Sequence, residues 1–210
     1  MDAKWLAVPT VAAGGAGGSY LGYQYLHQKG ESIKTKLGDL LLKFDDSFNE
    51  KWKARASLVS SKDTLPESLN KFRSSSGNKE ISEANIKGWC KDQIEKEFTS
   101  ETDSLFVSIR DYCTFNNKDK LGDKVISEDL ESGNIKSSGK WSTANQKLTS
   151  ASEDGMSSTM KEIKAKVSSS SGGTQDTKAL RTWCEGIYPS YYKGEDDSDF
   201  KDAKTYCVEK

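Results

Sequence analysis

The chain has 210 residues, and its 31 basic residues nearly balance its 32 acidic ones, for a formal net charge of −1. No strong positive field results, and only four of the basic residues are arginine, so nucleic acid is not expected as a partner. The length suits one domain or two small ones, and small domains bury so little surface that they need additional links.

Residues 1–30 are predicted to form a transmembrane helix. No charged residue lies between Trp5 and Leu26, and a helix of about 20 residues crosses a hydrocarbon core of about 30 Å. Small residues recur at every fourth position on one face: Gly14, Gly18 and Gly22. Such a face lets two membrane helices approach closely, which predicts self-association of the anchor.

A cleaved signal peptide is the alternative interpretation of this segment, because the short apolar core at residues 6–13 is followed by small residues. The run "GAGGS" also suggests a phosphate-binding loop. We reject that interpretation, since the third glycine of the dinucleotide fingerprint is missing. The flanking charges do not decide the orientation, which has to be inferred from the cysteines.

An amphipathic helix is predicted over residues 31–60. Its apolar residues recur at steps of three and four: Ile33, Leu37, Leu40, Leu41, Phe44, Phe48, Trp52, Ala56 and Val59. This spacing is typical of one helix face. The helix is expected to lead from the membrane into a folded part.

Two segments of equal length, Trp89–Cys113 and Trp183–Cys207, indicate an internal duplication. Eight of their 25 aligned positions are identical, including all four cysteines of the chain. The duplication predicts two tandem helical units, residues 52–115 and residues 140–210. Residues 116–139 are polar and contain glycine, so they are predicted to be a linker.

Each unit is predicted to contain three helices, since the alternation typical of strands is nearly absent. Asp103 and Asp197 are the expected N-caps of the third helices, and Pro189 is expected to end the second helix of the second unit. Four aromatic residues are predicted to anchor the cores: Trp52, Trp89, Trp141 and Trp183.

The cysteines predict two disulfides, Cys90–Cys113 and Cys184–Cys207, because each copy carries a complete pair. Closing a loop of about 24 residues contributes about 3 kcal/mol to the stability of so small a unit. The alternative is four buried free thiols that pack as small apolar groups. Disulfides would place the soluble part outside a reducing cytosol.

Neither catalysis nor a metal or other cofactor is predicted. His27, the one histidine, lies at the edge of the membrane segment, so a histidine-based triad or zinc site cannot form. The acidic run "GEDDSD" at residues 194–199 suggests a calcium loop, but Lys201 stands near the position that requires glycine. We interpret this run as an exposed helix start. A carboxylate-based hydrolase is the third-ranked hypothesis.

An aromatic cluster in the second unit is a candidate contact patch for a protein partner or a host-surface ligand: Tyr188, Tyr191 and Tyr192. Tyrosine offers a large amphipathic area at low entropic cost. The alternative places these side chains in the core beside Trp183.

The start "KWLAVPTVAAGGAGG" (Lys4–Gly18) and the two WC…YC segments resemble the paralogous families of short hypothetical proteins in haemotropic mycoplasmas. Expansion into many paralogues implies a surface role in host contact or antigenic variation. The resemblance implies no functional residue.

These observations predict an all-α, single-pass membrane protein with its soluble part outside the cell and a non-enzymatic role in binding or display. The alternative is an intracellular, membrane-tethered scaffold with reduced cysteines, which would use the helix at residues 31–60 to bind a partner.

Overall fold

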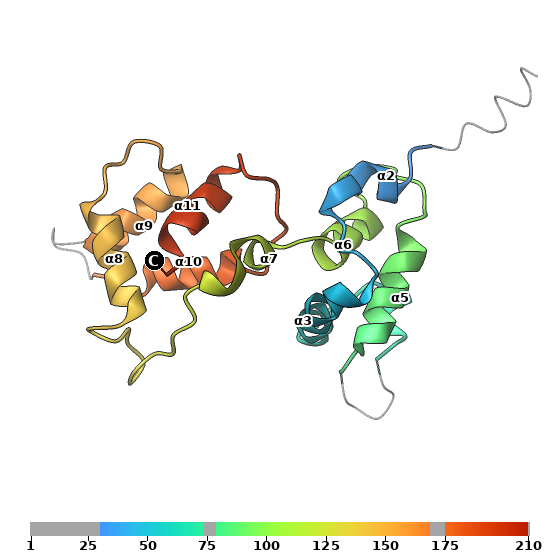
Figure 1. Ribbon diagram of the computed structural model, residues 1–210, viewed down its shortest axis with the longest axis horizontal. Helices are drawn as coiled ribbons and strands as arrows, with labels where there is room; N and C mark the ends of the chain where they lie inside the picture. Colours follow the sequence, from blue (N-terminus) through green and yellow to red (C-terminus); the bar gives the residue numbers. More distant parts are fainter. Residues whose placement is uncertain (1–29, 74–78, 169–174, 210) are drawn as a thin grey trace, which may run out of the picture.

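The computed structural model describes residues 30–73, 79–168 and 175–209, and these are mostly helical. The helices form two groups, each around its own hydrophobic cluster, with α7 on the side of the second group that faces the first (Figure 1). We call the helices α2 to α6 the first unit and the helices α7 to α11 the second unit.

The first unit surrounds a core that contains Trp52, Ile86 and Ile109, and all three side chains are fully buried. Its elements in chain order are α2 (Ile33–Leu37), η1 (Gly38–Leu40), η2 (Asp46–Phe48), α3 (Asn49–Ser60), α4 (Glu67–Asn70), α5 (Glu83–Gln93) and α6 (Ser104–Cys113). The helices α3, α5 and α6 contact one another and enclose most of the core.

The second unit repeats this arrangement around Trp141, Leu148 and Leu180. Its elements are α7 (Asn117–Leu121), η3 (Gly122–Lys124), α8 (Lys140–Ser150), α9 (Ser158–Ser168), α10 (Ala179–Ile187) and α11 (Ser198–Tyr206). Three of the four predicted tryptophan anchors are buried, whereas Trp183 is only partly buried against the core.

The predicted helix starts at the two aspartates are confirmed. The Asp103 carboxylate accepts hydrogen bonds from the amides of Leu105 and Phe106, both at 3.0 Å. The Asp197 carboxylate accepts one from the amide of Phe200 at 3.1 Å. Each carboxylate satisfies amides that have no partner within the first turn of a helix. The α10 helix ends at Ile187 and Tyr188 is its C-cap, so Pro189 follows the helix as expected.

The prediction of one continuous helix over residues 31–60 is wrong. The chain there forms α2 followed by η1, then η2 followed by α3, and residues 41–45 between η1 and η2 are not helical. Gly38 ends α2 with a φ of 49°, a conformation that residues with a side chain rarely adopt. The regular apolar spacing arises because all these pieces bury side chains in the same core.

The segment 116–139 is more than the predicted linker. It begins with α7, where Asn116 and Asp119 form a reciprocal capping box, and continues through η3. Val125 and Ile126 then enter the core of the second unit. Short buried contributions of this kind are difficult to recognise in a polar stretch.

Both units begin with the same backbone pairing. The amide of Lys34 donates to the Ile94 carbonyl at 2.8 Å, and the amide of Lys118 donates to the Tyr188 carbonyl at 2.9 Å. After the short helix, the amides of residues 42 and 126 donate to the carbonyls of Cys113 and Cys207, both at 2.9 Å. These contacts are isolated bridges, and the described part of the chain contains no longer strand.

No helix among the described residues has the length and apolar character needed to cross a membrane. The segment predicted to do so, with Gly14, Gly18 and Gly22, lies outside the described residues.

Candidate functional site between the two units

Both predicted disulfides are confirmed. Cys90 in α5 is bonded to Cys113 at the end of α6, and Cys184 in α10 to Cys207 just after α11, with a Cα–Cα distance of 5.6 Å in each pair. All four side chains are fully buried. Each bond therefore ties together the last two helices of its unit, α5 to α6 and α10 to α11, inside the core.

The residues directly after Cys113 join the two units without a free linker. The amide of Phe115 donates to the Leu40 carbonyl of the first unit at 2.9 Å, and the Phe115 carbonyl accepts from the Tyr192 amide of the second at 3.0 Å. The Asn117 side chain donates to the Ile187 carbonyl at 3.0 Å. One short segment is thus hydrogen-bonded to both units at once.

A buried ion pair crosses the same joint. The Arg55 guanidinium, from α3 and 1% exposed, donates to the Asp119 carboxylate of α7 and to the Thr114 carbonyl at 2.8 Å. Asp119 is only 9% exposed, and the Lys51 ammonium lies 3.6 Å from its second oxygen. Removal of one partner would leave a buried charge without compensation, so this pair holds α3 against α7.

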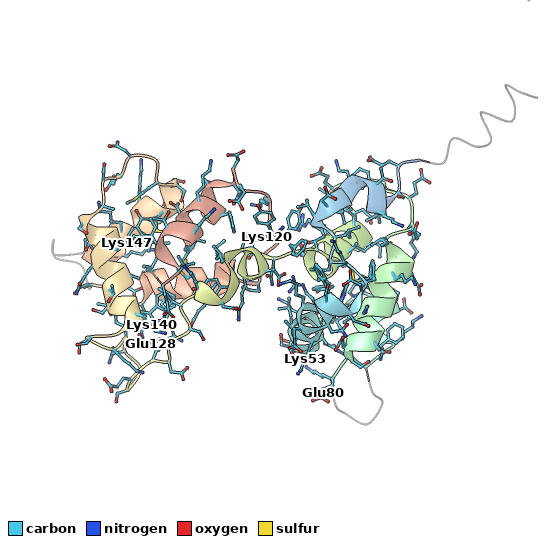
Figure 2. All side chains as sticks on the ribbon, viewed as in Figure 1. Lys53, Glu80, Lys120, Glu128, Lys140 and Lys147 are labelled. Atoms are coloured by element: carbon cyan, nitrogen blue, oxygen red, sulfur yellow. A yellow bond between two sulfur atoms is a disulfide. The ribbon has the colours of Figure 1, made fainter. Side chains whose placement is uncertain are left out.

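Aromatic rings and a cation complete the joint. The Lys120 ammonium, labelled in Figure 2, lies 3.9 Å from the ring centre of Phe115 and 5.1 Å from that of Tyr192. The Phe115 ring also contacts Phe48 of the first unit edge-on, with centroids 5.8 Å apart. These contacts pack rings from both units against the shared segment.

An open groove of about 710 Å³ lies beside this joint. We call it the inter-unit groove, because both units line it; the residues used below are Lys36, Lys62, Glu101, Arg110, Asp111, Tyr191 and Lys193. Its volume is within the range of ligand sites, which often lie between domains.

Cations outnumber anions in the inter-unit groove. Its two anions already have partners: Glu101 lies 3.0 Å from the Lys36 ammonium, and Asp111 lies 2.9 Å from the Arg110 guanidinium. Lys62 and Lys193 are exposed, and the nearest carboxylate to Lys193 is 3.8 Å away. The groove is therefore locally positive on a chain whose net charge is slightly negative.

Tyr191 is the aromatic contact of the groove. Its ring lies 5.4 Å from the guanidinium carbon of Arg110, across the boundary between the units. Burial raises the pKa of the Tyr191 phenol, so the ring stays neutral and presents a hydroxyl next to the cations.

The predicted contact patch of three tyrosines does not form at the surface. Tyr188 is 8% exposed and Tyr192 is 6% exposed, because the first lies in the core and the second packs edge-on against Phe200. Tyr191, with its side chain partly exposed, is the member that a ligand could reach. The alternative of core packing thus applies to two of the three residues.

The acidic run at residues 194–199 has structural contacts. Asp197 caps α11, and the Glu195 carboxylate accepts from Lys204 at 3.0 Å and from the Tyr192 hydroxyl at 3.1 Å. The hydrogen bond from Lys204 is the largest cause that lowers the pKa of Glu195. Among the described residues, no three histidine, cysteine or acidic side chains gather as metal ligands would.

The joint residues Arg55, Asp119 and Asn116 were missed by reasoning from sequence. A signal for part of them was present: "KLGD" occurs at residues 36–39 and again at residues 120–123, where α2 and α7 end. This tetrapeptide marks the true start of each unit.

Searches of protein-family models, of curated proteins and of solved structures found no match to this chain.

Proposed function

We propose that this protein is a non-enzymatic, single-pass membrane protein whose two units are displayed outside the cell for contact with a host or partner surface. The inter-unit groove is its contact site. The observation that carries the proposal is the pair of disulfide-closed units, which are joined by a buried ion pair and line a common positive groove.

Three features support the outside location and the anchor. Closed structural disulfides are typical of oxidising compartments. Each one here is buried in a small helical core, and small domains bury so little surface that they need such links. The charge-free sequence between Trp5 and Leu26 supports a membrane anchor next to them.

A binding role fits the groove better than catalysis does. Its two carboxylates are engaged by Lys36 and Arg110, and therefore neither is placed as a free acid or base. The exposed lysines and the partly exposed Tyr191 offer instead a positive surface with an aromatic contact. Such a surface suits an anionic group on a partner.

Thiol labelling of intact cells tests the proposal. A membrane-impermeant maleimide is added to cells that produce the full chain, before and after an impermeant reductant. We expect no labelling without reductant and labelling of Cys90, Cys113, Cys184 and Cys207 after it, because the bonded thiols become available only then. Labelling of all four after lysis and without reductant would contradict external display and favour the intracellular scaffold.

A further inference from the structure

The second unit contains a segment that is longer than its counterpart in the first unit. The amides of Leu42 and Ile126 mark the same point in the two units, since each donates to the carbonyl of the second cysteine of its unit. Nine residues, 43–51, then precede the core tryptophan of the first unit, whereas fourteen, 127–140, precede that of the second. The additional residues are not needed to close the shared helical core, because the first unit closes it without them.

The longer segment folds into a tight turn. The amide of Glu131 donates to the Asn134 carbonyl at 2.8 Å, and the amide of Asn134 donates to the Glu131 carbonyl at 2.9 Å. The two residues between them, Ser132 and Gly133, have φ values of 50° and 79°. Positive φ at both central residues is the geometry of a two-residue hairpin turn. We call residues 129–134 the projecting turn, because the loop between α7 and α8 extends beyond the helices of the second unit (Figure 1).

The projecting turn carries two carboxylates without a partner. Asp129 and Glu131 are exposed, and neither forms an ion pair with any residue that the structure describes. The nearby Lys178 ammonium donates to the Gly133 carbonyl at 3.2 Å and not to a carboxylate. The small residues Ser132 and Gly133 form the tip, so its backbone can approach another surface closely. The turn therefore presents two negative charges on a narrow tip of defined shape.

The inter-unit groove has groups of the opposite kind. Lys62 forms no ion pair within the described part of the chain, and Lys193 has only the long contact of 3.8 Å with Asp197. Tyr112 of α6 lines the groove as Tyr191 does, and neither hydroxyl makes a hydrogen bond to a described residue. Burial raises the pKa of both phenols, so each keeps a proton that it can donate to a carboxylate.

The groove suits a turn better than it suits an extended or a helical segment. An extended peptide docks on the edge of a sheet, and residues 30–73, 79–168 and 175–209 form no sheet. A docked helix needs a row of apolar contacts, but the groove residues Leu37 and Phe106 are at most 4% exposed. The groups that remain accessible are mainly cations and hydroxyls, which bind carboxylates.

We propose that the inter-unit groove of one copy of this chain receives the projecting turn of a second copy. The carboxylates of Asp129 and Glu131 meet the unpaired cations of the groove, and the two phenols donate to these carboxylates. No residue of the projecting turn lines the groove of its own chain, so both surfaces stay available. This inference rests on the proposed function, in which the groove is a contact site, and it names the partner.

The distribution of charge favours a second copy as the occupant. The net charge of the chain is only −1, yet unpaired charges of opposite sign are concentrated on the turn and in the groove. Every copy presents both surfaces, so the contact is head-to-tail and continues from one copy to the next. Copies anchored in one membrane, as proposed above, would also meet at a raised effective concentration.

Energy transfer between labelled copies tests the proposal. The full chain, carrying Gly18→Leu to remove the predicted association of the anchor, is placed in detergent micelles with a donor or an acceptor dye at its C-terminus. We expect association that weakens as salt is added. Asp129→Lys with Glu131→Lys makes the turn as positive as the groove, and Lys62→Glu with Lys193→Glu makes the groove as negative as the turn. Each variant alone should associate about tenfold more weakly, since like charges then face each other.

A mixture of the two variants separates charge pairing from misfolding. The positive groove of the first variant still fits the negative turn of the second, and the reversed pair is also complementary, so the mixture should associate as the unmodified chain does. Glu153→Lys with Glu162→Lys changes two exposed carboxylates elsewhere in the second unit and should leave association unchanged.

Three results would overturn the proposal: no association of the unmodified chain, no recovery in the mixture, or an equal loss in the Glu153→Lys, Glu162→Lys control. None of them would alter the thiol labelling of intact cells, which measures where the chain lies and not what it binds. Failure of this inference is therefore distinguishable from failure of the proposed display.

Discussion

The Tyr188 hydroxyl connects three parts of the second unit. From the end of α10 it donates to the Cys207 carbonyl at 2.7 Å and lies 3.2 Å from the Ile126 carbonyl. Burial raises the pKa of this phenol above its ordinary value of about 10. A residue that the sequence suggested for surface contact therefore serves the stability of the fold.

Replacement of Tyr188 tests this role. Tyr188→Phe should lower the free energy of unfolding at neutral pH by about 1–2 kcal/mol, because the buried carbonyls lose their donor. In the unmodified chain the folded phenol keeps its proton after the unfolded one has lost it. The contribution of Tyr188 to stability should then be constant below a pH of about 10 and fall as the pH rises above it.

Urea unfolding at a series of pH values measures both effects. The free energy of unfolding of the Tyr188→Phe variant should fall less steeply with rising pH than that of the unmodified chain. Tyr191→Phe is the control, since its partly exposed hydroxyl makes no hydrogen bond within the described residues, and it should change the neutral-pH stability little. An unchanged alkaline decline in Tyr188→Phe would contradict the role of this phenol.

At the scale of elements, the two capped helices allow a comparison between equivalent positions. The Asp103 carboxylate accepts from two amides at the start of α6, whereas the Asp197 carboxylate accepts from one at the start of α11. Both helices carry a cysteine of the disulfide at or just after their last turn. The caps thus hold the end of the helix that the disulfide does not.

Removal of the two caps should therefore destabilise the protein by different amounts. Asp103→Ala and Asp197→Ala should each lower the free energy of unfolding by about 0.5–2 kcal/mol, with the larger loss for Asp103. Asp199 lies in the first turn of α11 and makes no capping hydrogen bond. The Asp199→Ala variant is therefore the matched control. Denaturant titrations would contradict the assignment if Asp199→Ala were as harmful as Asp197→Ala.

At the scale of the whole molecule, the two units behave as a pair because the chain between them is shared. The segment 114–118 completes the backbone pairing of the first unit and begins that of the second. The Arg55–Asp119 ion pair spans the same boundary, and the inter-unit groove lies next to it. The shape of the groove thus depends on the joint.

A double-mutant cycle measures this coupling. Arg55→Met should lower the free energy of unfolding by about 3 kcal/mol, since it leaves the Asp119 charge buried. Combined with Asp119→Asn, the losses should be less than additive by about 1–3 kcal/mol. Lys51→Met is the control, because its side chain is 33% exposed and should contribute below about 1 kcal/mol. Additive losses for the first two changes would show that the pair does not couple the units.

Much of this fold was accessible from the sequence, because the duplication is written in local patterns. The equal spacing of Cys90–Cys113 and Cys184–Cys207 predicted the disulfides, and the Asp-Ser pairs predicted the starts of α6 and α11. Each of these signals depends on neighbours along the chain. Local chemistry was therefore sufficient to identify them.

Only the tertiary structure decided the joint and the inter-unit groove beside it. Arg55 and Asp119 are far apart in the sequence, and nothing local shows that both are buried and paired. The apolar spacing of residues 31–60 predicted one helix, since it cannot tell a single face from several pieces that point into one core. The sequence by itself determined the repeated helical unit and its covalent link, whereas packing between distant segments decided how the units meet, because burial is a property of the folded chain.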